Sequence, residues 1–209
     1  MTGLLVVVTL LSSSACKDLS QCIVWTLNEY ISTRQQAELA ASVPSDFLMR
    51  AWFKWRQAHD YAKERYLIPI AKSRGALFGG GVTVSALYRG ENGITPAQFR
   101  EMATRDPFGH IFPAWGHREI AHGAIASRQY LDYVLRWCFA QIDAGVDGLF
   151  MDEITAAYGP YEGYDDASIQ QFAKWLERKY CQGKGWKPDD RRWHEKFGID
   201  LHDRDICPD

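Results

Sequence analysis

Apolar and amphipathic segments alternate along the chain in a regular order. Short apolar runs bounded by polar or turn-forming residues predict strands at residues 22–27, 46–54, 76–87 and 146–151. Apolar residues at helical spacing predict helices at residues 33–42, 57–73, 127–144 and 167–180, and Thr95 followed by Pro96 begins a shorter one. Repeated strand–helix units of this kind predict a parallel sheet with helical connections.

The number of strand–helix units predicts about half of an eight-stranded barrel. A (β/α)8 barrel usually has about 250 residues, and this chain has 209. We therefore expect an α/β fold in which residues 22–209 form the N-terminal part of a TIM barrel with about four βα units. The polar ending at residues 205–209 favours a half-barrel, and a smaller open α/β sheet is the alternative.

The first 21 residues allow two interpretations. Leu4 to Leu11 is an apolar run followed by small residues and Cys16, as in a signal or lipoprotein segment. No Lys or Arg precedes the run, although a positive start belongs to that pattern. The competing interpretation is a first strand at residues 4–9, so export and a cytoplasmic location both stay open. No other stretch approaches the length of a transmembrane helix.

Composition narrows the class of protein. The chain is 46% hydrophobic and 24% charged, which is typical of a soluble globular protein. Its net charge of −2 gives no general attraction to nucleic acid. The five cysteines lack metal-ligand spacing, so we expect neither a zinc site nor another cofactor. The 8 Trp and 10 Tyr suit core packing and also the stacking of sugar rings.

Candidate site residues were sought where predicted strands end. In parallel α/β folds functional side chains collect at the carboxyl ends of strands. We expect substrate binding by side chains near the ends of these strands or in the longer loops, namely Arg50, Trp52, Lys54, Tyr88, Glu91, Asn92, Trp115, His117, His122 and Tyr158.

Asp152 and Glu153 directly follow the apolar run at residues 146–151 and carry the sharpest signal. Strand side chains alternate, so one carboxylate is expected to face the active edge and the other a neighbouring loop. Glycosidic cleavage needs a carboxylic acid to protonate the leaving oxygen and a second carboxylate on another strand. A carboxylate that only accepts backbone hydrogen bonds or pairs with a cation is the alternative.

The segment from Asp147 to Tyr180 resembles the fourth strand and following helix of glycoside hydrolase family 42 β-galactosidases. In that family the strand ends in Asn-Glu, and the helix carries a pattern like residues 172–180 (FAKWLERKY). The resemblance implies that Glu153 is the acid/base and that Asp152 replaces the asparagine. Residues 79–115, with YRGENG at 88–93, also resemble uncharacterised bacterial glycosidase-like barrels.

The resemblance and the carboxylates together predict a glycoside hydrolase acting on an oligo- or polysaccharide. The residues offer no strong second carboxylate, which fits a half-barrel that lacks its nucleophile and is inactive by itself. A non-catalytic carbohydrate-binding barrel is the main alternative.

Two other motifs were weighed against this hypothesis. A phosphate site at Gly79–Gly81 ranks last, since the Lys-Ser/Thr of a phosphate loop is missing. These glycines fit a bulge, a barrel corner or the close approach of a ligand. His117 and His122 lack the spacing of a helical metal site, so sugar binding or loop hydrogen bonding is preferred.

Overall fold

A computed structural model describes residues 5–9, 23–27, 30–53, 60–153 and 161–198. Two compact units divide the chain. The sheet unit comprises residues 1–84, 90–93 and 132–154, and the second unit comprises residues 85–89, 94–131 and 155–209. Among the helices in the described ranges, none is both long enough and apolar enough to cross a bilayer.

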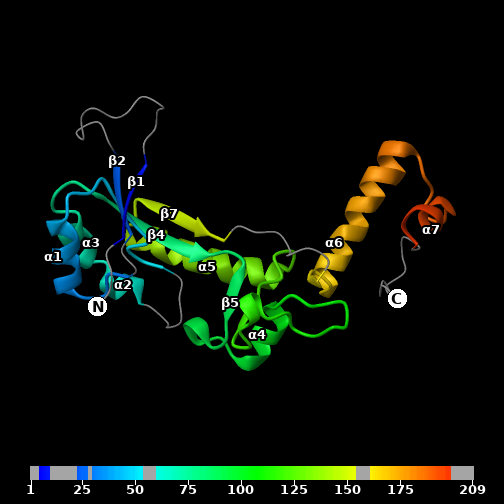
Figure 1. Cartoon of the computed structure of the whole chain (residues 1–209), viewed down its shortest axis with the longest axis horizontal. Coiled ribbons are helices and arrows are strands. Elements are labelled where there is room, and N and C mark those ends of the chain that lie inside the picture. Colours follow the sequence, from blue (N-terminus) through cyan, green and yellow to red (C-terminus); the bar gives the residue numbers. More distant parts are fainter. Residues whose placement is uncertain (1–4, 10–22, 28–29, 54–59, 154–160, 199–209) are drawn as a thin grey trace. The chain divides into compact units, whose positions relative to one another are not determined.

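The sheet unit is built on a five-stranded sheet (Figure 1). Its order is β1 (Leu5–Thr9), β2 (Ile23–Leu27), β3 (Phe47–Met49), β4 (Leu77–Thr83) and β7 (Gly148–Asp152). β2, β3, β4 and β7 run parallel to one another, which confirms the predicted α/β class with a parallel sheet. β1 is antiparallel to β2. Residues 5–9 are therefore a strand, but not one that continues the parallel order.

Short helices and part of one long helix belong to the sheet unit. They are α1 (Arg34–Ser42), α2 (Tyr61–Glu64), α3 (Leu67–Ala71) and the C-terminal half of α5 (Arg128–Ala144), which runs along β4 and β7 in Figure 1. The helix expected at residues 57–73 is α2 and α3, separated by a turn at residues 65–66. The core includes Leu48, Trp52, Tyr61 and Phe78, and it joins β3 and β4 to these helices.

The three glycines of β4 allow the close approach of neighbouring side chains. A Cβ at Gly79 would lie 2.7 Å from the Phe47 ring, and one at Gly81 would lie 2.7 Å from the Phe53 ring. The buried amide of Gln141 accepts from Gly81 N–H at 2.8 Å and donates to its carbonyl oxygen at 3.0 Å. β4 is continuous through these residues, so close packing, and neither a bulge nor a phosphate loop, explains them.

The second unit begins where the predicted strand at residues 76–87 divides. β4 ends at Thr83, and β5 (Ala86–Tyr88) pairs with β6 (Ile120–His122) in an antiparallel ladder. α4 (Pro96–Met102) begins as predicted, with a capping box made by Thr95. Two short 3₁₀ turns, η2 (Glu91–Gly93) and η3 (Ala114–Gly116), belong to the sheet unit and the second unit respectively.

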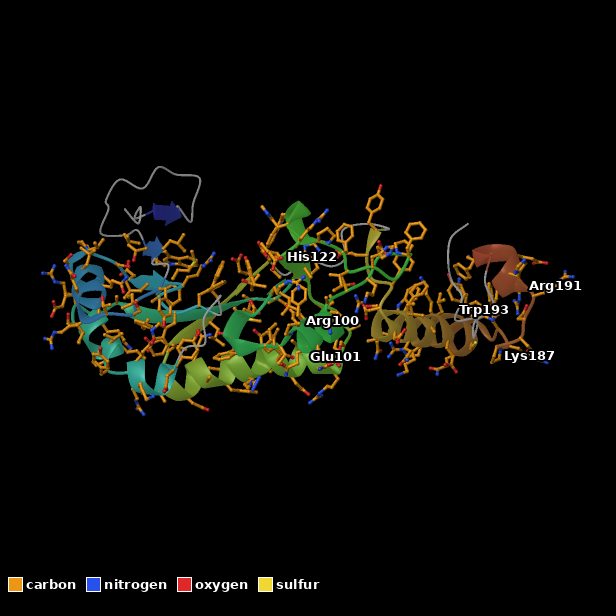
Figure 2. The ribbon with its side chains drawn as sticks, turned by 90° about the horizontal axis from the view of Figure 1, so that it is seen from below. Arg100, Glu101, His122, Lys187, Arg191 and Trp193 are labelled. Carbon is orange, nitrogen blue, oxygen red and sulfur yellow. The ribbon has the colours of Figure 1, made fainter. Side chains whose placement is uncertain are left out.

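The C-terminal segment has more helix than its polar sequence predicts. α6 (Asp166–Leu176), capped by Asp165, continues into the π-helical turn η5 (Glu177–Gln182), and α7 (Arg192–Phe197) follows. Leu176, Tyr180 and Trp193 form a small buried cluster. The Trp193 indole N–H donates to the Lys187 carbonyl oxygen at 2.8 Å (Figure 2). The sequence predicted a helix at residues 167–180 but not α7.

Candidate functional site

The last residue of β7, Asp152, is paired with the first residue after β3, Arg50. Arg50 Nη1 donates to Asp152 Oδ2 at 2.8 Å. β4 lies between β3 and β7 in the sheet order, so this ion pair reaches across the carboxyl end of β4. The Arg50 and Asp152 side chains are 17% and 26% exposed, so the ion pair is largely but not completely shielded from bulk water. Two of the predicted site residues are thus brought together.

An aromatic ring supports the Arg50 guanidinium. Its central carbon lies 4.0 Å from the centroid of the buried Phe53 ring. A guanidinium over an aromatic face gains electrostatic attraction to the ring quadrupole. The Asp152 carboxylate and the Phe53 ring therefore hold the Arg50 side chain in one orientation.

The residue after Asp152 has an unusual backbone. Glu153 has φ 52°, in the left-handed region, and its Oε2 atom is buried. Strand alternation ends at Asp152, so the left-handed turn, rather than the strand pleat, directs the Glu153 side chain. Left-handed backbone is unfavourable for a residue with a Cβ atom.

The same backbone feature recurs along this edge of the sheet. Arg50, directly after β3, has φ 57°, and Tyr30, which follows β2, has φ 86°. Tyr30 also donates its hydroxyl to Glu64 at 2.6 Å, and burial together with this bond raises the pKa of Tyr30. Non-glycine residues in sparsely populated backbone regions concentrate at functional sites. We call Tyr30, Arg50, Phe53, Asp152 and Glu153 the carboxyl-edge site.

Other residues predicted to bind substrate have structural contacts in the sheet unit. Trp52 is fully buried, and its indole N–H donates to the Ile31 carbonyl oxygen at 3.1 Å. Glu91 is also fully buried and accepts from the Tyr133 hydroxyl at 2.6 Å. Asn92 donates to that hydroxyl oxygen at 3.1 Å. Their part in substrate binding stays a prediction, and the geometry gives them a packing role.

The remaining predicted residues lie in the second unit or outside the described ranges. Tyr88 ends β5 and is half-buried. Trp115 and His117 are exposed, and His122 is buried in β6 (Figure 2). Lys54 and Tyr158 lie outside the described residues.

Tyr30, Phe53 and Glu162 take part in these contacts but are not among the predicted site residues. Phe53 supports Arg50, and Glu162 pairs with His122, with 2.7 Å between His122 Nδ1 and Glu162 Oε2. Phe53 lies in the apolar run 46–54, where nothing in the sequence distinguishes its ring from those of the neighbouring apolar residues. Glu162 lies in a glycine- and tyrosine-rich loop with no periodicity to locate it.

Within the described ranges, no group of three or more His, Cys, Asp or Glu side chains is arranged to hold a metal ion. Asp152 has a guanidinium as its partner, and His122 has a single carboxylate. The carboxyl-edge site thus combines one carboxylate paired with a cation and one carboxylate on a left-handed residue.

Comparison of the chain with protein-family models, with curated proteins and with solved structures gives no match. The resemblance to family 42 enzymes therefore depends on residues 147–180 alone.

Proposed function

We propose that the sheet unit is part of a (β/α)8 barrel that hydrolyses O-glycosidic bonds, with Glu153 as the proton donor. The observation that carries the proposal is the different placement of two adjacent carboxylates. Arg50 Nη1 donates to Asp152 Oδ2 at 2.8 Å, while Glu153 has left-handed backbone that takes its side chain out of the strand alternation. We assign the orientation of substrate to the carboxylate held by Arg50 and proton transfer to its neighbour.

The reaction that follows conserves atoms and protons. The Glu153 carboxylic acid gives its proton to the glycosidic oxygen as the bond between that oxygen and the anomeric carbon breaks. A second carboxylate attacks the anomeric carbon or activates a water, and water supplies the hydroxyl of the sugar product. The proton that this water loses goes to Glu153 in a retaining enzyme and to the second carboxylate in an inverting one. Asp152, held by Arg50, orients a sugar hydroxyl by accepting its hydrogen bond through Oδ1.

The second carboxylate belongs on another strand, roughly 5–5.5 Å away in a retaining enzyme and about 6.5–9.5 Å in an inverting one. The residues directly after β3 and β4 are Arg50 and Val84, so these strands do not supply it. Glu29 follows β2 but lies outside the described residues. We propose that a strand other than β3 and β4 contributes the nucleophile or base.

The test is hydrolysis of a panel of aryl glycosides by the full-length protein and its variants. Glu153→Gln should lower kcat by at least about 100-fold, since a general acid contributes roughly 10²–10⁴-fold. Asp143→Asn removes an exposed carboxylate on α5 and should leave activity unchanged. Full activity in Glu153→Gln would contradict the assignment of Glu153 as the proton donor.

A carbohydrate-binding protein without hydrolysis is the second candidate. The Arg50–Asp152 pair supports this candidate, because such a pair can bind a sugar hydroxyl without any part in catalysis. Saturable binding of an oligosaccharide, with no product after prolonged incubation of the full-length protein, would select this candidate.

A further inference from the structure

Trp115, in the second unit, presents its indole to solvent from a turn that is fixed on both sides. It is the central residue of η3 and is 46% exposed. Trp115 and Gly116 both have left-handed backbone, with φ 49° and 74°. The preceding Ala114 is fully buried, and its carbonyl oxygen accepts from His117 N–H at 2.9 Å. A bulky residue keeps this conformation only where its surroundings enforce it.

A buried imidazole supports the indole from the protein interior. The His122 ring lies edge-on to the Trp115 ring, with centroids 6.0 Å apart and an interplanar angle of 88°. Phe112 packs against the same imidazole at 6.1 Å. His122 is 5% exposed and Glu162 is 7% exposed. Their side chains meet at 2.7 Å, so the carboxylate fixes the orientation of the imidazole and, through it, the indole.

The segment that carries Glu162 is itself fixed within the second unit. Gly163 N–H donates to Thr104 Oγ1 at 3.0 Å, and Tyr164 N–H donates to the Arg105 carbonyl oxygen at 3.1 Å. Three separate stretches of chain, namely η3, β6 and the segment before α6, therefore hold one exposed ring in place.

This arrangement differs from an incidental exposed tryptophan. Burying two ionisable groups is unfavourable, and apolar side chains of similar volume often stabilise a protein as well or better. A buried pair beneath a strained and exposed ring is therefore better explained by presentation of that ring than by stability.

We propose that Trp115 is a stacking platform for a pyranose ring of a neutral oligosaccharide. The face of an indole is the negative part of its quadrupole, and the C–H groups on one face of a pyranose are weakly positive. A nucleic-acid base would also stack, but the net charge of −2 gives no attraction for a phosphate backbone. The choice of a saccharide rests on the proposed function, whereas the platform contains neither Asp152 nor Glu153.

The exposed Trp175 on α6 provides a matched control. It is 42% exposed, similar to Trp115, and its own contacts are a stacked Phe172 ring at 5.8 Å and the Lys179 ammonium at 4.3 Å. Neither contact is with a buried pair of side chains like His122 and Glu162. Trp175 should therefore behave as an ordinary surface side chain.

The test uses the indole N–H signals of the eight tryptophans in a ¹H–¹⁵N NMR spectrum of the full chain. Trp115→Phe and Trp175→Phe identify the two signals by their loss. The probes are four separate hexasaccharides: cellohexaose, xylohexaose, mannohexaose and β-1,4-galactohexaose. With at least one of them, the Trp115 signal should shift saturably while the Trp175 signal stays in place.

Affinity measurements complete the test. Trp115→Ala should weaken the binding of that saccharide by at least about tenfold, Trp115→Phe should retain most of the affinity, and Trp175→Ala should match the unmodified protein. Circular dichroism and thermal melting establish that the variants are folded. No shift with any hexasaccharide, equal shifts of both signals, or stronger binding of a thymidine dodecamer would each overturn the proposal.

The proposed hydrolysis and the platform can fail separately. The Trp115 shift should persist in Asp152→Asn and Glu153→Gln. Shift without hydrolysis would contradict only the proposed function, and hydrolysis without a shift would contradict only the platform.

Discussion

Strand β7 starts beside one aspartate–cation pair and ends on another, and the two pairs have different surroundings. At the amino-terminal edge, Asp147 accepts from Lys72 Nζ at 2.6 Å and from Phe78 N–H at 2.7 Å, so it also caps the start of β4. At the carboxyl edge, Asp152 accepts from Arg50 at 2.8 Å. The Asp147 carboxylate therefore bonds a backbone amide of β4 as well as a cation, whereas the Asp152 side chain bonds the cation of Arg50.

The backbone conformation also differs between the two edges of the sheet. Turns with positive φ before β4 and β7 use glycine, at Gly75 (φ 93°) and Gly145 (φ 107°). At the carboxyl edge the left-handed positions hold Tyr30, Arg50 and Glu153. Glycine adopts this conformation without steric penalty, whereas other residues are strained. Strained non-glycine residues thus lie at the carboxyl edge and glycines at the amino-terminal edge, and it is this difference on which the proposed site depends.

The largest effect is expected at Asp147. Partial burial raises the pKa of its carboxyl group, but the hydrogen bonds from Lys72 and Phe78 outweigh this, so the pKa is lowered from its usual value. Asp147→Asn should lower the free energy of unfolding near pH 7 by about 2 kcal/mol, the range for hydrogen bonds to a charged group. Urea denaturation measures this, and a double-mutant cycle with Lys72→Met isolates the ion pair.

The pH dependence of this effect has a defined sign. A carboxyl group whose pKa is lowered on folding stabilises the protein above its unfolded pKa of about 3.9 and loses that contribution as the pH falls through the folded value. The difference between Asp147→Asn and the unmodified protein should therefore shrink well below about pH 4. A difference that grows on acidification would contradict the pairing.

Gly75→Ala tests the glycine turns. No atom lies within 4 Å of the position of an added Cβ, so any loss of stability reports backbone strain alone. We expect a loss of about 1–2 kcal/mol, measured by thermal unfolding. Gly75→Asn should lose less, because asparagine tolerates left-handed backbone. Equal stability of all three proteins would remove the contrast between the edges.

Asp152→Asn should affect stability less than Asp147→Asn does. Asp152 bonds a cation but caps no backbone amide through its side chain, and its partner has the Phe53 ring as a further contact. We expect about 1 kcal/mol in urea denaturation. A loss as large as that of Asp147→Asn would mean that both pairs serve the fold.

Glu153→Gly should have the smallest effect on stability. Relief of left-handed strain, about 1–2 kcal/mol, is largely offset by the greater freedom of glycine in the unfolded chain, about 0.5–1 kcal/mol. Stability should therefore be equal or slightly higher, while hydrolysis is lost. A clear loss of stability would indicate that Glu153 is placed for packing.

The alternation of apolar and amphipathic segments was enough to predict the parallel sheet, because buried strands and amphipathic helices have distinct periods. Asp152 was found because the end of its strand is visible in the sequence, whereas Arg50 was named within a strand predicted at residues 46–54 that in fact ends at Met49. The contact between Arg50 and Asp152 across β4 was not predicted, since it depends on the order of the strands in the sheet and on the left-handed backbone of Arg50. Splitting of the run at residues 76–87 was missed because both halves are apolar.

Loop contacts are less accessible to sequence analysis. His122 and Glu162 are 40 residues apart in segments without periodicity, and no local pattern predicts their pairing. α7 was missed because the contact that stabilises it joins Trp193 to Tyr180, which lies in a different helix. The predicted barrel and its chemistry remain proposals that depend on the carboxyl-edge site.

The central claim is that Glu153 donates the proton while Asp152 is held by Arg50. Its most direct test compares 2,4-dinitrophenyl and phenyl glycosides as substrates of the full-length protein. A general acid assists the departure of a poor leaving group strongly and of a good one little. Glu153→Gln should therefore have a kcat/KM at least about 100-fold lower on the phenyl glycoside, yet keep most of its kcat/KM on the dinitrophenyl glycoside. Asp152→Asn should slow both substrates by the same factor. Equal slowing of both substrates in Glu153→Gln, or a leaving-group dependence confined to Asp152→Asn, would contradict the account.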